Sequence, residues 1–194
     1  MTNEHLLQYI EFLQRAEQLK STVRTAYTSA GRRESTAEHS WRLALMAMIF
    51  EDEFGGLDHH RILKLCLVHD LGEAIGGDIP AVAQKADAPK AAEERKDLLE
   101  LTSVLPPQVR EEILALWDEY ESNRTPEAQV VKGLDKLETL IQHNQGLNPE
   151  NAIDYRFNLD YGRRYTDAHP LLDQIRRLVD EATAFRAANS GWTR

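Results

Sequence analysis

The sequence predicts an all-α protein, and three observations lead to this prediction. Apolar residues recur at the three- and four-residue spacing of amphipathic helices along most of the chain. Only 7% of the 194 residues are aromatic, whereas sheet-rich chains depend on aromatic and β-branched side chains. No stretch alternates between apolar and polar residues as a half-buried strand does. We expect one domain over residues 1–194, with a core at about residues 20–145 and outer helices at both ends.

Three helices are expected in the first half of the chain. The first covers about residues 3–20, and its apolar face consists of Leu6, Leu7, Ile10, Leu13 and Leu19. The polar residues 21–34 then form a loop or short turn. The second helix begins at Ser35-Thr36-Ala37-Glu38, a capping-box pattern, and continues to about residue 54. This helix and the third, at about residues 58–75, are apolar over most of their surface, so both should lie at the centre.

Four more helices are expected in the second half. A polar outer helix follows Pro89, and Pro106-Pro107 opens the next one. Thr125-Pro126 places a cap residue before a proline and starts a helix that runs to about residue 143. After a loop at about residues 144–158, the last helix covers about residues 170–188. The pattern therefore predicts a bundle of about six to eight helices.

Charge and cysteine content exclude several classes of protein. The formal net charge is −9, so there is no basic surplus to hold a nucleic-acid backbone, and no nucleic-acid partner is expected. The longest strongly apolar stretch, residues 43–50, is far shorter than a membrane span, and residues 1–20 lack the apolar core of a signal peptide. Cys66 is the only cysteine, which rules out an intrachain disulfide and fits a reducing compartment. We expect a cytoplasmic protein without a membrane partner.

Five imidazole or carboxylate side chains occupy unusual positions: His39, His69, Asp70, Glu73 and Asp135. Four of them are expected on the two central helices, where buried carboxylates need a cation, a shared proton or several hydrogen bonds. Each residue taken singly also has a simpler interpretation. A histidine on an apolar face is usually a hydrogen-bonded core residue, and Asp135 could be solvated beside Lys132 and Lys136.

Taken together, these residues form a metal-ligand pattern of two imidazole nitrogens and two carboxylate oxygens: a histidine, a His-Asp pair thirty residues later, and a distant aspartate. Three stretches extend the pattern: Ala37–Ala44, Leu67–Pro80 and Leu134–Glu138. Across about residues 6–182 the chain resembles the HD phosphohydrolases. The second stretch, with the form HD-x-x-E-x-x-x-x-D-I-P, resembles the 5′-deoxynucleotidase branch of that family.

The resemblance implies a helical HD domain and assigns a role to each candidate residue. The first divalent metal would be held by His39, His69, Asp70 and Asp135. Glu73 and Asp78 would be catalytic acid or base groups on the substrate side, or ligands of a second cation that the Ile79 carbonyl could also reach. Arg24 lies where the branch places an arginine on the substrate phosphate, a role that suits its planar fork; its alternative is an ordinary surface arginine. Some bacterial members carry tryptophan after that arginine, whereas this chain has Thr25.

The implied reaction is the hydrolysis of a nucleoside or deoxynucleoside 5′-monophosphate to nucleoside and phosphate by a metal-activated water. Mixed histidine and carboxylate ligands suit Mn²⁺, Co²⁺, Fe²⁺ or Zn²⁺ at the tight site, and an oxygen-only second site suits Mg²⁺. The resemblance also implies a homodimer, and the Trp117 and Trp192 regions are candidate apolar contacts.

Three other functions stay open at this point. A cyclic-nucleotide or nucleoside-polyphosphate hydrolase of the same family is the nearest. A polyphosphate site needs extra basic residues around it, and the stretch just after Asp78 offers only Lys85 and Lys90. A di-iron oxygenase would need further histidines between His69 and Asp135, where the sequence has none. A non-catalytic nucleotide-binding module would have no need of the complete set of ionisable residues.

Overall fold

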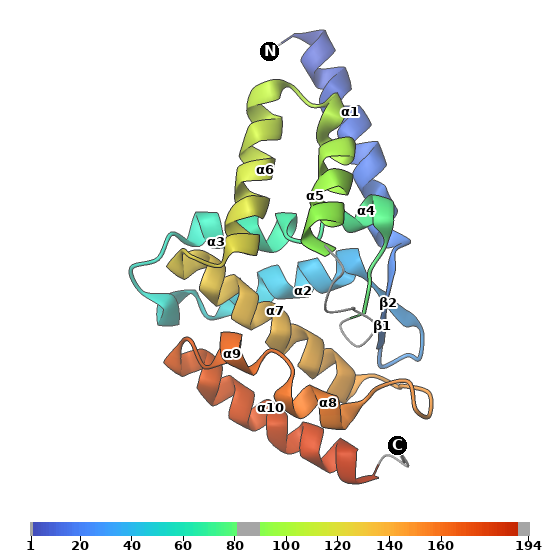
Figure 1. Cartoon of the computed structure of the whole chain (residues 1–194), viewed down its shortest axis with the longest axis vertical. Coiled ribbons are helices and arrows are strands. Elements are labelled where there is room, and N and C mark those ends of the chain that lie inside the picture. The colour runs from blue at the N-terminus through green and yellow to red at the C-terminus, as the bar shows by residue number, and fades with distance from the viewer. Residues whose placement is uncertain (1, 81–89, 190–194) are drawn as a thin grey trace.

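The computed structural model describes residues 2–80 and 90–189 (Figure 1). The longer helices are α1 (Asn3–Ala16), α2 (Thr36–Ile49), α3 (His59–Val68), α5 (Lys90–Leu101), α6 (Pro107–Ser122), α7 (Pro126–Gln145) and α10 (Pro170–Asn189). The shorter helical segments are η1 (Glu17–Lys20), η2 (Glu51–Phe54), α4 (Glu73–Gly76), η4 (Thr102–Val104), α8 (Tyr155–Asp160) and α9 (Arg163–Thr166). The all-α bundle that the sequence predicts is confirmed.

Helix α7 runs through the middle of the molecule, with α2 and α3 on one side and α9 and α10 on the other (Figure 1). Thr125 caps its first turn by accepting a hydrogen bond from the backbone of Ala128 at 3.2 Å, and a proline occupies the first helical position. Leu134, Leu137 and Leu140 are fully buried. Because most of its surface is covered by other helices, α7 can carry polar side chains into the interior.

The predicted loop at residues 21–34 is instead a small antiparallel hairpin of β1 (Val23–Tyr27) and β2 (Arg33–Ser35). Its turn includes Gly31 at a φ of +82°, a conformation that glycine adopts without strain. The polar composition concealed the hairpin, because few of its side chains are buried. β1 packs against α7, and β2 leads directly into the capping box of α2, which the structure confirms.

The predicted third helix, at about residues 58–75, is broken. α3 ends at Val68, and α4 starts only at Glu73. Gly72 lies in the break, where a Cβ atom would stand 2.6 Å from the backbone oxygen of Glu94 on α5. The close passage of α5 therefore requires glycine at this position. The break places His69 and Asp70 in a turn beside α7 instead of on a continuous helix.

Two expectations about buried apolar faces are wrong. In α1 the predicted core face is largely exposed, as Leu7 at 67% and Leu13 at 65% show, whereas Leu19 in η1 is buried. α2 is not buried on all sides, because its Trp41 side chain is 63% exposed.

The candidate subunit contacts fare differently. Trp117 is buried and offers no surface for a subunit contact, and Trp192 lies outside the described residues. Among the described residues, no helix is both long enough and apolar enough to span a bilayer.

Candidate active site

A pocket of about 990 Å³, open to solvent, lies over one face of α7. Its walls come from β1, the segment from His69 to Pro80, α5, α6 and α8. α7 supplies one stripe of side chains to it: Lys132, Asp135, Lys136, Thr139 and His143. The lining is far more ionisable than that of a typical apolar pocket. This pocket contains most of the residues that the sequence singles out.

Two histidines meet beside the pocket: His69 lines it, and His39 is fully buried next to His69. The Nε2 atoms of His39, on α2, and His69, after α3, lie 3.4 Å apart. The Nδ1 atom of His69 is 2.9 Å from the Cys66 carbonyl oxygen, and the Nδ1 atom of His39 contacts the Glu138 carboxylate. Both partners accept hydrogen bonds, so each neutral ring carries its proton on Nδ1 and turns an Nε2 lone pair toward the other ring.

Two carboxylates complete this cluster. Asp70 Oδ2 lies 3.1 Å from the Nε2 atom of His69 and 3.7 Å from that of His39, and Asp135 Oδ1 lies 3.3 Å from His39 Nε2. The other oxygen of Asp135 accepts hydrogen bonds from the Tyr120 hydroxyl at 2.6 Å and from Lys136 at 2.8 Å. The structure thus brings together all four residues of the predicted ligand set from three separate parts of the chain.

The local charges set the ionisation of the cluster. Burial would raise the pKa of Asp70, but His69 and His39 hold it below its usual range. The pKa of Asp135 is also held low, because Lys136 and His39 outweigh the effect of burial. For His39, burial and Arg24 lower the pKa, yet Glu138 and Asp135 raise it to about 10. Glu138 and Asp135 therefore favour a protonated His39 ring when no cation is bound.

Glu73 and Asp78 also line the pocket, and so does Ile79. A carboxylate oxygen of Glu73 accepts a hydrogen bond from the Thr36 hydroxyl at 2.9 Å. Burial, followed by the charges of Asp70 and Asp78, raises the pKa of Glu73 to about 9. Burial likewise raises the pKa of Asp78, although Arg24 opposes it. Both side chains line the same pocket as His69 and Asp70.

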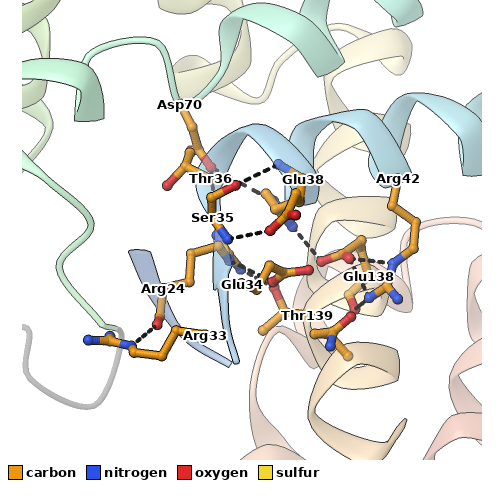
Figure 2. Close-up of polar contacts among 12 residues, drawn as sticks. Arg24, Arg33, Glu34, Ser35, Thr36, Glu38, Arg42, Asp70, Glu138 and Thr139 are labelled. Carbon is orange, nitrogen blue, oxygen red and sulfur yellow. Dashed lines mark hydrogen bonds and ion pairs between the residues drawn. The ribbon is translucent and has the colours of Figure 1, made fainter. Parts of the chain in front are cut away.

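Arg24 is not a surface arginine, because its side chain is only 12% exposed. It extends from β1 and donates a hydrogen bond to the Thr139 hydroxyl on α7 at 2.9 Å (Figure 2). Its guanidinium also lies 3.4 Å from a carboxylate oxygen of Glu34 and 3.7 Å from Asp70 Oδ2. The hairpin that the sequence did not reveal is therefore the element that carries this arginine into the pocket.

Glu138 is a site residue that the sequence reasoning missed. It is fully buried, contacts the Nδ1 atom of His39 and accepts a hydrogen bond from Arg42 Nε at 2.6 Å (Figure 2). Its position could have revealed it, because it continues the apolar stripe of Val131 and Leu134 on α7. A charged residue on such a stripe needs a partner in the core.

The basic residues of the pocket were also undercounted. Lys90 lines it, and so do Lys132 and Lys136, whereas Lys85 lies outside the described residues. Lys132 donates to the backbone oxygen of Tyr120 at 3.1 Å, and Lys136 is held by Asp135. Both lysines are thus engaged with the protein at the wall of the pocket.

Within residues 2–80 and 90–189, two groups of side chains approach closely enough to share an ion: His39 with His69 and Asp70, and His39 with Glu34 and Glu138. The first group offers two Nε2 lone pairs and a carboxylate, and Asp135 stands beside it. In the second, Arg24 and Arg42 already neutralise the carboxylates. The first group is therefore the place that fits a divalent metal.

The profile of the HD domain family matches residues 16–176, which include every residue of this cluster. The chain belongs to the HD-domain family. This HD-domain protein is 36% identical to human 5′-deoxynucleotidase HDDC2 over 182 residues, which cover 93% of this chain and 87% of the human protein. It is 34% identical to the *Dictyostelium discoideum* protein of the same name over 86% of this chain and 94% of that protein.

A solved structure shares the fold of this HD-domain protein. The crystal structure of a predicted metal-dependent phosphohydrolase from *Magnetospirillum magnetotacticum* MS-1 superimposes with a TM-score of 0.79 and 30% sequence identity. The match covers 93% of this chain and 94% of that one. The HD-domain family that the three sequence motifs indicate is confirmed by the family profile and by the curated relatives.

Proposed function

We propose that this protein is a divalent-metal-dependent 5′-nucleotidase that hydrolyses nucleoside or deoxynucleoside 5′-monophosphates to nucleoside and phosphate. One observation carries the proposal: the Nε2 atoms of two histidines and the carboxylates of Asp70 and Asp135 converge beside an open pocket. The relatives named 5′-deoxynucleotidase and the phosphohydrolase structure support the substrate class and the reaction.

In this proposal His39, His69, Asp70 and Asp135 hold the cation. Their mixture of nitrogen and oxygen ligands suits Mn²⁺, Co²⁺, Fe²⁺ or Zn²⁺. A divalent cation supplies Lewis acidity toward a phosphate oxygen and makes water nucleophilic near neutral pH. The contacts of both Nδ1 atoms support this assignment, because such partners fix the ring orientation and the tautomer of metal-binding histidines.

Arg24 would bind the substrate phosphate. Its guanidinium lies between Asp70 and Thr139 at the wall of the pocket, with five N–H donors in a rigid plane. Paired hydrogen bonds from such a fork to two phosphate oxygens orient the phosphorus and balance the charge that develops on it. Burial of the arginine strengthens this interaction, since the surroundings are less polar than water.

Glu73 and Asp78 would act on the substrate side. Each can hold a proton for the leaving 5′-oxygen or orient the attacking water, and each can instead bind a second cation such as Mg²⁺, together with the Ile79 carbonyl. Matched Glu73→Gln and Asp78→Asn variants separate these roles. Loss of a second-cation ligand is partly overcome by a high Mg²⁺ concentration, whereas loss of the proton-transfer group is not.

The experiment that tests the proposal is phosphate release from a panel of ribo- and deoxyribonucleoside 5′-monophosphates. The protein is stripped with a chelator and reloaded with Mn²⁺, Co²⁺ or Mg²⁺, and Asp70→Ala is the blank. We expect metal-dependent release that Asp70→Ala abolishes. Release from cyclic nucleotides or nucleoside polyphosphates alone would transfer the function to another HD phosphohydrolase reaction. Nucleotide binding without any hydrolysis would favour a non-catalytic module.

Three further features belong to this proposal. We infer a homodimer, for which the exposed Leu7 and Leu13 of α1 offer apolar surface, and analytical ultracentrifugation measures the assembly state directly. A cytoplasmic location fits the single cysteine. One domain over residues 1–194 stays a prediction, which limited proteolysis with mass spectrometry would test.

A further inference from the structure

The pocket has a second end, away from the histidine cluster. Asp135 and His143 both face the pocket from α7. They are eight residues apart, which corresponds to about 12 Å along the helix axis. At the His143 end the lining gains apolar and aromatic side chains, Ala152, Ile153, Phe157 and Tyr161, beside the polar Asp154 and Asn158. Aromatic and apolar surface is thus available at this end of the pocket, at a distance from Asp135 that suits an extended nucleoside monophosphate.

Phe157 and Tyr161 form an aromatic wall at this end. Their ring centroids lie 5.6 Å apart with an interplanar angle of 32°. Phe157 is 40% exposed although it is a large apolar side chain, so part of its ring faces the open pocket. Tyr161 also lies near the metal end, since the ammonium of Lys136, which contacts Asp135, is 5.4 Å from its ring centroid.

The wall is held rigidly from behind by Arg176 of α10, which is fully buried. Its guanidinium donates hydrogen bonds to the backbone oxygens of Asn158, Leu159 and Tyr161, at 3.0, 2.7 and 2.7 Å. At the other end of α8, Asp154 accepts a hydrogen bond from the Phe157 backbone at 2.9 Å. Both ends of this short helix are therefore satisfied by side chains.

A hydrogen bond joins the wall to α7. Asn158 Nδ2 lies 2.9 Å from His143 Nδ1. Burial, and then Arg24, lower the pKa of His143 to about 4, so its ring is neutral near pH 7. His143 consequently places no imidazolium charge beside the aromatic wall.

We propose that Phe157, with Tyr161 beside it, is the stacking surface for the nucleobase of the substrate. This inference rests on the proposed function. A phosphate at the histidine cluster leaves the base to extend toward α8, where aromatic surface is available. Stacking on an aromatic ring is largely independent of the base, because every base has a π-face. The residue after Arg24 is Thr25, which supplies no ring on the β1 side of the pocket.

The test compares two substrates that differ only in the base: 2′-deoxyadenosine 5′-monophosphate and 2-deoxyribose 5-phosphate. For each variant the measured quantity is the ratio of kcat/KM for the nucleotide to kcat/KM for the sugar phosphate. We expect Phe157→Ala and Phe157→Leu to lower this ratio roughly 5- to 100-fold, and Phe157→Tyr to keep it near the wild-type value. The loss should come from KM, since the ring does not touch the reacting atoms.

Phe185→Ala is the matched control, because Phe185 is an exposed phenylalanine of α10 that is not part of the pocket lining. A calorimetric titration with 2′-deoxyadenosine, which is not turned over, measures base binding independently of activity. A ratio and a nucleoside affinity that are the same in Phe157→Ala as in Phe185→Ala would overturn the stacking site and leave the nucleotidase proposal intact. If no variant releases phosphate, the proposed function fails, and the nucleoside titration still decides the inference.

Discussion

Replacing Glu138 by glutamine should weaken metal binding although Glu138 is not one of the proposed ligands. The side chain is fully buried between two donors (Figure 2). One carboxylate oxygen contacts the Nδ1 atom of His39, and the other lies 2.6 Å from Arg42 Nε and 2.5 Å from Arg42 Nη2. Glutamine has nearly the same shape but only one acceptor oxygen, so it cannot serve both partners.

Either orientation of the new amide is unfavourable. If its oxygen faces Arg42, its NH₂ group donates to His39 Nδ1, which moves the ring proton to Nε2 and removes the lone pair that faces His69. If its oxygen faces His39, two donors oppose each other at Arg42. Loss of such a supporting carboxylate typically costs 10- to 100-fold in metal affinity, or about 1.4–2.7 kcal/mol.

The assay is a calorimetric titration of chelator-stripped protein with Mn²⁺. Glu112→Gln is the control, because Glu112 is an exposed carboxylate paired with Lys64 on the surface. We expect the Mn²⁺ dissociation constant to rise about 10- to 100-fold in Glu138→Gln and to be unchanged in Glu112→Gln. An affinity within twofold of wild type, in a variant that unfolds normally when metal-free, would refute the argued role of Glu138.

Three other predictions concern stability. Chelation should lower Tm by about 5–11 °C, since saturation at 100 times Kd contributes about 2.7 kcal/mol, and an unchanged Tm would contradict a buried metal site. Arg176→Met should lower the free energy of unfolding by about 3–5 kcal/mol in urea, because three backbone oxygens lose their donor; a loss below 1 kcal/mol would contradict this. His143 has a pKa of about 4 in the folded chain against 6.5 unfolded, so its contribution is full above pH 6.5 and is lost as the pH falls toward 4. His143→Asn should flatten the acid-side loss of stability, and an unchanged pH profile would contradict the assignment.

The helices could be predicted because their signals are local. The capping box at Ser35, the Thr125-Pro126 start of α7 and the apolar spacing within each helix all lie within a few residues of the structure they specify. The proposed ligands were recognisable for another reason. Their residue types and spacing match a family pattern, and the structure places all four in one cluster.

The features that were not predicted depend on contacts between distant segments. The glycine in the break after α3 is required by α5, which passes so close to Gly72 that no side chain fits. The hairpin packs on α7 through few buried residues, so it lacks an alternating apolar pattern. The apolar face of α1 illustrates the opposite error, because helical spacing predicts an apolar stripe but not what covers it.

Metal binding and phosphate recognition should be coupled through Asp70. Its carboxylate lies 3.1 Å from His69 Nε2 and 3.7 Å from the Arg24 guanidinium, so it serves both the proposed cation site and the proposed phosphate ligand. A cation at Asp70 neutralises the charge that attracts Arg24 and leaves the guanidinium available to an anion. Coupling of this kind is typically 5- to 150-fold and reciprocal. Mn²⁺ should therefore increase phosphate affinity, measured by calorimetry, more in the wild type than in Arg24→Gln. If Mn²⁺ increased phosphate affinity equally in both proteins, the cation would act on phosphate directly and Arg24 would keep its ion pair with Asp70.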